Sequence, residues 1–570
     1  MRLISSLLSL VVAAAPLAAQ NPRPSQQVDS NIGGASSPSI STSGVLGGNM
    51  TSVFYEDGAN NTLWAVTSDG RGLLWSTPSR VDDDLTGAAK AVDSFSICTT
   101  SNGNQYACWR DNRNGLSDDL YFSVNRGGTW QPNIRLDKGY AIGANPVRNY
   151  VMDCEGDFVA VLISTDNIDE ELYLVISTDG GATFSSALPA TSHNGQADVD
   201  AIALDLEDSI VHIAFADNFA ANPSDAVYYA AYDLGLAAFT ALDVPVSSNI
   251  QAAGGDVDDA LAISASGPNV AIAMQADNLA GLSEELWVNV KTGGAFSGDQ
   301  LVGSYLAGTN DVDNPAILVH DLNTVVVSWE DDRLAIDHTF VASADITGGF
   351  AGFAPETQVS TNGGSFPRLA GRGDYVAVTF TAGVNPHTAA AAVSRDGGMS
   401  FGNEIQSSDN TGDVDFAEIC FNPLYGNFIT TWLANDLGIN HVYVGGFRSQ
   451  TLTPTGTFSA GNPVSIQASG FGASEDGNLF AALASGGTSS FFLPFGDGRD
   501  LGLLHDPYIS WSITQIPGAM SGVLSAGAGS TPTLSLPALA PGTVIYFAGV
   551  SLQANKQLFS LTDVTSVTIL

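Results

Sequence analysis

Positive charge is scarce in this sequence. Its 570 residues include 19 Lys and Arg against 59 Asp and Glu, which gives a formal net charge of −40. A surface this acidic repels phosphate backbones and anionic lipid, so nucleic-acid binding is not expected. Only 14% of the residues are charged, whereas 44% are hydrophobic. That composition supplies a large core and excludes an acidic disordered chain.

Cysteines and long apolar runs are also few. Four cysteines do not make a disulfide scaffold in a chain of 570 residues. Cys98 and Cys108 flank an expected hairpin and are the candidates for a disulfide in an oxidising compartment, which leaves Cys154 and Cys420 as buried thiols. No stretch reaches the roughly 20 apolar residues that a membrane span needs, so membrane insertion is not expected.

The first 20 residues have the features of a secretory signal peptide. Arg2 precedes an apolar run over 3–15, and the small residues Ala18 and Ala19 precede Gln20. We therefore expect cleavage near Gln20 and a mature protein that is secreted, periplasmic or held at the cell surface. The alternative is a buried N-terminal helix.

A repeat of about 54 residues organises most of the chain. Its marker is an Asp that follows an alternating apolar segment. The copies end at Asp57, Asp111, Asp166, Asp217, Asp277 and Asp331, with weaker copies near Phe380 and Trp432. Each unit contains four short alternating segments between turn residues, which is the pattern of one β-propeller blade.

Eight such units predict an all-β fold, an eight-bladed β-propeller over residues 21–450. Seven blades is the alternative if the weakest unit is not a blade. The segment QQVDSN (26–31) is similar to the fourth segment of a unit. It is predicted to complete the eighth unit, so that the two ends of this region meet.

Three turns share a motif of Ser, Asp or Asn, glycines and a final aromatic residue. They are SVNRGGTW (123–130), STDGGATF (177–184) and SRDGGMSF (394–401). These turns resemble the Asp-box, or BNR, repeat of sialidases and related secreted propellers. The resemblance implies a structural role, away from the active site, for Ser123, Asn125, Gly127, Trp130, Ser177, Asp179, Gly181, Phe184, Ser394, Asp396, Gly398 and Phe401.

The resemblance does not extend to the catalytic residues of sialidases. Those enzymes clamp a carboxylate with three arginines and carry an Arg-Ile-Pro signature, which is absent here. Only Arg148 and Arg368 lie at the starts of first segments, near the expected channel mouth. They are candidates for binding a carboxylate group of a ligand, and the alternative is that they pair with acidic neighbours.

The segments between units are rich in Asp and are expected to be loops on the face opposite the Asp-box turns. They read ADVDA (197–201), GDVDD (255–259), NDVDN (310–314) and GDVDF (412–416). Ca²⁺ takes six to eight oxygen ligands, which makes Asp256, Asp258, Asp311 and Asp313 candidate calcium ligands. Asp200 and Asp415 are candidate ligand-binding residues. Two other interpretations stay open, an acid–base carboxylate pair for glycoside cleavage and carboxylates that each cap their own loop.

Residues 451–570 differ from the repeat region because they are rich in Gly, Ala, Ser and Thr. Short alternating runs such as TVIYFAG (543–549) predict a separate C-terminal β-sandwich. The sequence as a whole predicts an exported propeller that recognises a glycan or another extracellular polymer without turnover. The alternative is a glycoside hydrolase or polysaccharide lyase with an atypical carboxylate site.

Overall fold

The structure is a computed structural model. It describes residues 23–30, 34–43, 50–58, 60–68, 72–83, 92–114, 118–137, 147–165, 171–193, 199–218, 225–277, 284–303, 311–321, 323–334, 336–409, 412–423, 425–436, 438–459, 462–488, 503–505, 507–514, 516, 518–535, 539–553 and 558–569. The predicted signal peptide, 1–20, lies outside the described residues.

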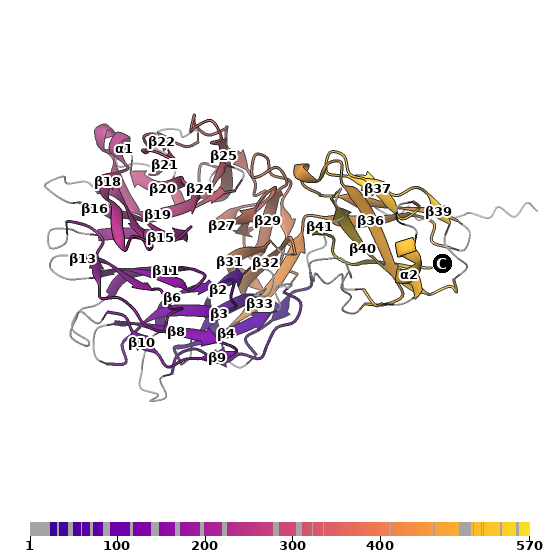
Figure 1. Cartoon of the computed structure of the whole chain (residues 1–570), viewed down its shortest axis with the longest axis horizontal. Helices are drawn as coiled ribbons and strands as arrows, with labels where there is room; N and C mark the ends of the chain where they lie inside the picture. Colours follow the sequence, from indigo (N-terminus) through magenta and orange to yellow (C-terminus); the bar gives the residue numbers. More distant parts are fainter. Residues whose placement is uncertain are drawn as a thin grey trace, which may run out of the picture.

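Antiparallel β-strands make up nearly all the regular structure, as the repeated alternating segments predicted (Figure 1). Among the described residues, the strands up to Arg448 form eight sheets. The first four sheets are β2 (Ala35–Ser43), β3 (Met50–Asp57), β4 (Thr62–Ser68) and β5 (Ser79–Arg80); β6 (Val92–Thr99), β7 (Gln105–Asp111), β8 (Asp119–Arg126), β9 (Thr129–Trp130) and β10 (Ile134–Arg135); β11 (Val147–Glu155), β12 (Phe158–Thr165), β13 (Glu171–Ser177) and β14 (Leu188–Pro189); and β15 (Val199–Glu207), β16 (Ile210–Asp217), β17 (Ala226–Asp233) and β18 (Ala238–Pro245).

The next four sheets repeat this order. They are β19 (Asp256–Ser266), β20 (Asn269–Asp277), β21 (Glu284–Thr292) and β22 (Gln300–Leu301); β23 (Val312–His320), β24 (Thr324–Asp331), β25 (His338–Asp345) and β26 (Thr357–Gln358); β27 (Gly364–Arg372), β28 (Tyr375–Ala382), β29 (Thr388–Ser394) and β30 (Ile405–Gln406); and β31 (Asp413–Asn422), β32 (Asn427–Asp436), β33 (Ile439–Arg448) and β1 (Gln26–Gln27). Helix α1 (Ser248–Ala253) connects the fourth and fifth sheets.

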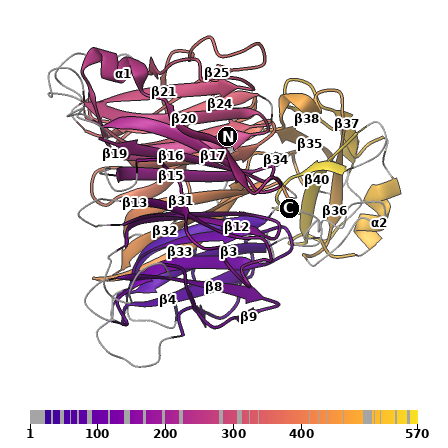
Figure 2. The same cartoon turned by 60° about the vertical axis from the view of Figure 1, so that its left-hand side comes forward.

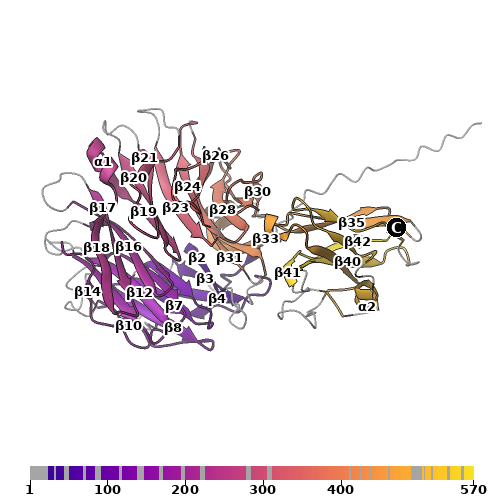
Figure 3. The same cartoon turned by 45° about the horizontal axis from the view of Figure 1, so that its top comes forward.

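The first strands of the eight sheets contact one another in a closed order. It runs β2, β6, β11, β15, β19, β23, β27, β31 and back to β2. The short last strands, such as β14 and β26, lie on the outside (Figure 3). Strand β1 pairs with β33, Gln26 opposite Val444, so the predicted closing strand is confirmed. This arrangement is consistent with a β-propeller.

The second strands are more completely buried than the predicted alternation implies. In β24 and β28 every residue is buried. A sheet between two neighbours is covered on both faces, so both sets of side chains need an apolar partner. Val325 and Val327, for example, pack in one cluster with residues of the preceding sheet, β20 and β21.

A β-bulge interrupts the start of every first strand. In seven sheets two or three residues of the first strand face one residue of the second, and in β6 one residue is inserted. The strand therefore continues past the bulge into the Asp-rich segments. Asp200, Asp256, Asp313 and Asp415 lie in β15, β19, β23 and β31, so the prediction of loops there was wrong. A bulge bends and twists a strand without ending its pairing.

Two of the three motif turns have the expected local geometry. The Asp179 carboxylate accepts hydrogen bonds from the Ala182 and Thr183 amides at 3.0 and 2.8 Å, and its hydrogen bonds with Thr183 lower its pKa to about 2. Gly181 has φ +79°, and a Cβ there would lie 2.6 Å from Phe122 Cζ. The same side-chain bonds recur around Ser394 and Asp396.

The third motif turn differs from the other two. Asn125 does not cap its own turn but donates a 2.7 Å hydrogen bond to Gln105 of the neighbouring strand. The segment forms a tight hairpin instead, because β9 pairs back onto β8. Trp130 still fills its expected place and packs edge-on against Phe54 of the first sheet.

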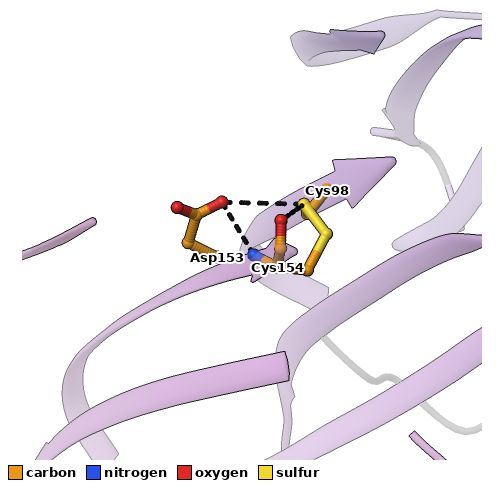
Figure 4. A group of neighbouring side chains, drawn as sticks. All are labelled: Cys98, Asp153 and Cys154. Carbon is orange, nitrogen blue, oxygen red and sulfur yellow. Dashed lines mark hydrogen bonds between the residues drawn. A yellow bond between two sulfur atoms is a disulfide. The ribbon is translucent and has the colours of Figure 1, made fainter. Parts of the chain in front are cut away.

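The expected Cys98–Cys108 disulfide is wrong. Cys98 bonds to Cys154, and Cys108 and Cys420 are buried free cysteines (Figure 4). Cys98 and Cys154 lie on the first strands of neighbouring sheets, with Cα atoms 6.0 Å apart, a distance that suits a disulfide. Cys108 lies on β7, opposite Ser96 rather than Cys98.

Residues after 450 form two further sheets beside the first body (Figures 1 and 2). One contains β34 (Thr451–Gly456), β35 (Pro463–Ser469), β38 (Gly529–Ser530) and β39 (Leu534–Ser535); the other contains β36 (Leu479–Ser485), β37 (Ser521–Val523), β40 (Val544–Leu552), β41 (Leu558–Leu561) and β42 (Thr565–Thr568). Residues of both sheets share one apolar cluster. A 3-10 helix η1 (Ala473–Glu475) and helix α2 (Pro507–Thr514) complete this part.

Buried polar contacts join the two parts. The Tyr375 hydroxyl donates to the fully buried Glu475 carboxylate and accepts the Gly472 amide at 2.8 Å. Arg448 Nη1 donates to the Thr562 carbonyl at 2.7 Å. Among the described residues, neither α-helix has the length and apolar character of a membrane span.

Candidate functional site

The bulges mark one end of the ring of sheets, and the motif turns mark the other. Within a sheet the first and third strands run in the same direction, because each is antiparallel to the second. The bulge lies at the start of the first strand, whereas the turn at Ser177–Phe184 follows the end of the third. The end with the bulges, the bulge face, is therefore opposite the motif turns.

The first residue of each bulge varies around the ring of sheets. In order these residues are Ser37, Ser94, Arg148, Asp200, Asp258, Asn314, Phe366 and Phe416. Two of the predicted ligand-binding residues, Arg148 and Asp200, are thus neighbours in this series. A repeated backbone feature therefore places residues of five types at one end of the molecule.

Arg148 and Asp200 line a cavity of about 530 Å³. Arg148 Nη2 lies 2.6 Å from Asp200 Oδ1. Arg148 thus pairs with an acidic neighbour, which was the alternative to ligand binding that the sequence left open. The two side chains are 33% and 20% exposed, so the ion pair remains accessible from the cavity. Asn149 Nδ2 also donates to the Asp200 carbonyl at 3.0 Å, which links the third sheet to the fourth.

Arg110 and Tyr150 also line this cavity, and sequence reasoning missed both. Arg110 Nη1 donates to the Arg148 carbonyl at 2.6 Å and supports the bulge from the second sheet. The Tyr150 hydroxyl lies 3.1 Å from Ser94 Oγ. Tyr150 stands in the segment NPVRNY, two residues after Arg148, but only the register of the bulge places it in the cavity.

Arg368 is not among the residues that line the cavity with Arg148. It lies on β27, the first strand of the seventh sheet, and its Nε donates to Glu418 Oε1 at 3.0 Å. Asp415 is exposed at the bulge of the eighth sheet. Each of the two predicted arginines is therefore paired with an acidic residue of the next sheet.

Asp311 and Asp313, two of the predicted calcium ligands, lie close together. Their carboxylate oxygens and one of Glu284 are all within 4.8 Å of one another. Gln275 Nε2 donates to Glu284 and, at 3.3 Å, to Asp313. Burial and the Asp311 charge raise the pKa of Asp313. Sequence reasoning missed Glu284, which the strand pairing of β20 with β21 positions.

The other two predicted calcium ligands are not part of this cluster as the structure describes it. Asp256 Oδ1 accepts the Asp225 amide at 2.5 Å. Burial and the charges of Asp256 and Asp311 raise the pKa of Asp277. The side chain of Asp258 lies outside the described residues.

Glu330 is a further acidic residue of the bulge face that the sequence did not single out. Its Oε2 accepts hydrogen bonds of 3.0 Å from both the Phe366 amide and Asn314 Nδ2. Both donors belong to bulges, in the sixth and seventh sheets. Burial raises the pKa of Glu330, and the Asp337 charge raises it further. Glu330 therefore orients two bulges and favours the protonated form more than an exposed carboxyl group does.

No protein-family model matches the chain, and no curated protein matches its sequence. Among solved structures, an ulvan lyase, a polysaccharide lyase, has a TM-score of 0.40 at 10% identity, with 75% of this chain and 93% of that chain covered. An α-L-arabinofuranosidase of Fusarium graminearum has a TM-score of 0.37 at 12% identity, with 66% and 97% covered. A mutant Trypanosoma rangeli sialidase has a TM-score of 0.33 at 8% identity, with 96% and 86% covered. The chain is thus distantly similar to carbohydrate-active enzymes, and similarity at this level carries no activity over to it.

Proposed function

We propose that this protein is an exported eight-bladed β-propeller with a C-terminal β-sandwich, and that its bulge face binds a glycan. The proposal rests on one observation. A bulge at the start of each of eight first strands places residues of five types at one end of the molecule, where three of those strands line a cavity of about 530 Å³. Repetition of the device with variation of the side chain is what a recognition surface requires.

The cavity supplies the groups that bind hydroxyls. Arg148 and Asp200 are a donor and an acceptor held 2.6 Å apart, and Tyr150 and Asn149 add uncharged polar groups. Together with Arg110, these residues give the cavity both donors and acceptors for the hydroxyl groups of a polar ligand. Burial of such a ligand between fixed polar groups gives both affinity and orientation.

Binding of soluble polysaccharides to the full chain, measured by isothermal titration calorimetry, tests the proposal. We expect Arg148→Gln to weaken binding at least tenfold, because the side chain that it removes lines the cavity. Arg372→Gln is the matched control. Arg372 is also an exposed arginine paired with an Asp, Asp321 at 3.4 Å, but it lies at the opposite end of its strand. Equal affinities for the two variants would contradict the proposal.

A glycoside hydrolase is the second candidate, and Glu330 favours it. A carboxyl group with a raised pKa can donate a proton to a leaving group. Paired glycosidase carboxylates are roughly 5 Å or more apart. Asp313 is the candidate for the second carboxylate, since it lies directly opposite Glu330 in the pairing of β23 with β24.

Release of reducing sugar from the same polysaccharides tests this second candidate. If the protein is a hydrolase, Glu330→Gln abolishes turnover and leaves binding intact, because the amide keeps an acceptor oxygen for the Phe366 amide. Turnover that survives the substitution, or the absence of turnover in the unaltered protein, excludes Glu330 as the proton donor.

A further inference from the structure

Phe366 and Phe416 form an aromatic pair on the bulge face. They are the first bulge residues of neighbouring sheets, in β27 and β31. Their ring centroids lie 5.5 Å apart with the planes inclined at 40°. Phe416 is 44% exposed, and Phe366 is partly buried. Large apolar side chains are therefore presented to solvent at two of the eight bulge positions.

The backbone at both positions is unfavourable for phenylalanine. Phe366 has φ +55° and Phe416 has φ +51°. Bulky residues rarely adopt this left-handed conformation, which Gly and Asn tolerate far better. The sixth sheet has Asn314 at the equivalent position, with φ +52°. Because the side chains remain partly or largely exposed, burial does not explain this unfavourable backbone conformation, which points to a function of the two side chains.

Charged residues flank the backbone of both phenylalanines. The Phe366 amide donates to Glu330 Oε2 at 3.0 Å, and the exposed Asp415 directly precedes Phe416. The Arg368–Glu418 ion pair joins the same two strands. The aromatic pair therefore has carboxylate acceptors and one guanidinium donor on the strands around it.

We propose that Phe366 and Phe416 form a stacking surface for a neutral sugar unit of the bound glycan. This inference rests on the proposed glycan-binding function and names its substrate class. A sugar ring presents C–H groups to an aromatic face and hydroxyl donors at its edge, which matches flat rings bordered by carboxylates. The net charge of −40 disfavours the approach of uronate and sulfate groups.

Affinity electrophoresis of the full chain tests the inference, with gels that contain a neutral polysaccharide (galactomannan, arabinoxylan or a soluble β-glucan), polygalacturonate or chitosan. We expect at least one neutral polysaccharide to retard the protein. Phe366→Asn and Phe416→Asn should each reduce that retardation at least tenfold in apparent affinity, without lowering the melting temperature, since Asn tolerates the backbone conformation. Phe416→Trp should retain binding.

Leu236→Asn is the control variant. Leu236 is 69% exposed and lies between β17 and β18, at the end of the ring opposite the bulges. The Leu236→Asn variant should therefore be retarded as strongly as the unaltered protein. Retardation that both Phe→Asn variants retain overturns the inference, as does preference for polygalacturonate or chitosan over every neutral gel. If Arg148→Gln loses retardation and both Phe→Asn variants keep it, this inference is overturned but the proposed function is preserved. If none of the gels retards the unaltered protein, both are overturned.

Discussion

Arg148 and Asp200, which occupy equivalent bulge positions in neighbouring sheets, form an ion pair of 2.6 Å at the edge of a cavity. Arg113 and Asp111 form a pair of similar length, 2.7 Å, but their side chains are only 12% and 2% exposed. The Arg113 guanidinium also stacks 4.0 Å from the centroid of the Tyr121 ring. The Arg113–Asp111 pair is buried, which predicts a role in stability, whereas the Arg148–Asp200 pair is accessible, which predicts a role in ligand binding.

Removal of one partner should distinguish these roles. Asp111→Ala removes the buried carboxylate that binds Arg113 and leaves that guanidinium paired with Asp83 at 2.9 Å; the buried N–H donors that lose their acceptor cost about 1–3 kcal/mol of unfolding free energy. Asp200→Ala breaks an accessible pair, and such pairs contribute about 1 kcal/mol or less. Urea denaturation of both variants measures the difference. Equal destabilisation would mean that Arg148 and Asp200 serve the fold rather than ligand binding.

The Cys98–Cys154 disulfide should stabilise the contact between the second and third sheets. It joins residues separated by 56 positions, and closure of a loop of that length corresponds to about 4 kcal/mol in the chain-entropy model. We expect the Cys98→Ser, Cys154→Ser double variant to melt at a lower temperature than the oxidised protein. Dithiothreitol should lower the melting temperature of the unaltered protein and not that of the variant. Peptide mapping that finds Cys98 linked to Cys108 would contradict the pairing.

Asp205 should make the folded state less stable as the pH rises. Desolvation and the neighbouring Asp153 charge raise its pKa well above 3.8. Below about pH 4 both folded and unfolded states hold the proton, whereas at higher pH only the folded state keeps it, and stability falls. Asp205→Asn should therefore increase stability at pH 7 and leave it unchanged near pH 4. Denaturation between pH 4 and pH 8 measures this.

Asp153 provides the matched control for that experiment. Its two oxygens accept the Leu206 and Cys154 amides at 2.8 and 2.7 Å. In Asp153→Asn the new NH₂ group faces an amide donor, so this variant should be less stable at both pH values. Stabilisation at pH 7 by both substitutions would contradict the assignment of the pH effect to Asp205 alone.

Calcium remains a prediction from the sequence, and thermal unfolding tests it. If Glu284, Asp311 and Asp313 bind Ca²⁺, the melting temperature rises with calcium and saturates, and at 100 times Kd the stabilisation is about 2.7 kcal/mol. Rotation of the Gln275 amide would add a fourth oxygen. Asp313→Asn should abolish the rise. Asp345→Asn, which changes an exposed carboxylate at the opposite strand end, should preserve it, and an equal response to Mg²⁺ would exclude a calcium site.

Much of the fold is encoded in local patterns. The repeat of about 54 residues predicted the succession of four-stranded sheets, because each sheet is built from one continuous stretch of chain. The closing strand was also predictable, since Gln26 and Gln27 stand in a segment similar to other fourth strands. The turns at Asp179 and Asp396 follow from residues within five positions of each other.

Only the tertiary structure shows which residues of neighbouring sheets are in contact. Cys98 meets Cys154, Arg148 meets Asp200, and Arg368 meets Glu418 at separations of 50 to 56 residues. No local period specifies such a pairing, because it depends on the exact register in which one sheet packs on the next. Within each sheet a bulge also shifts the pairing of the first strand with the second, by one residue in seven sheets and by two in β19. A one-residue shift turns a side chain to the other face of its strand, and this is why the sequence revealed the repeat but not the position of Glu330, Phe366 or Tyr150.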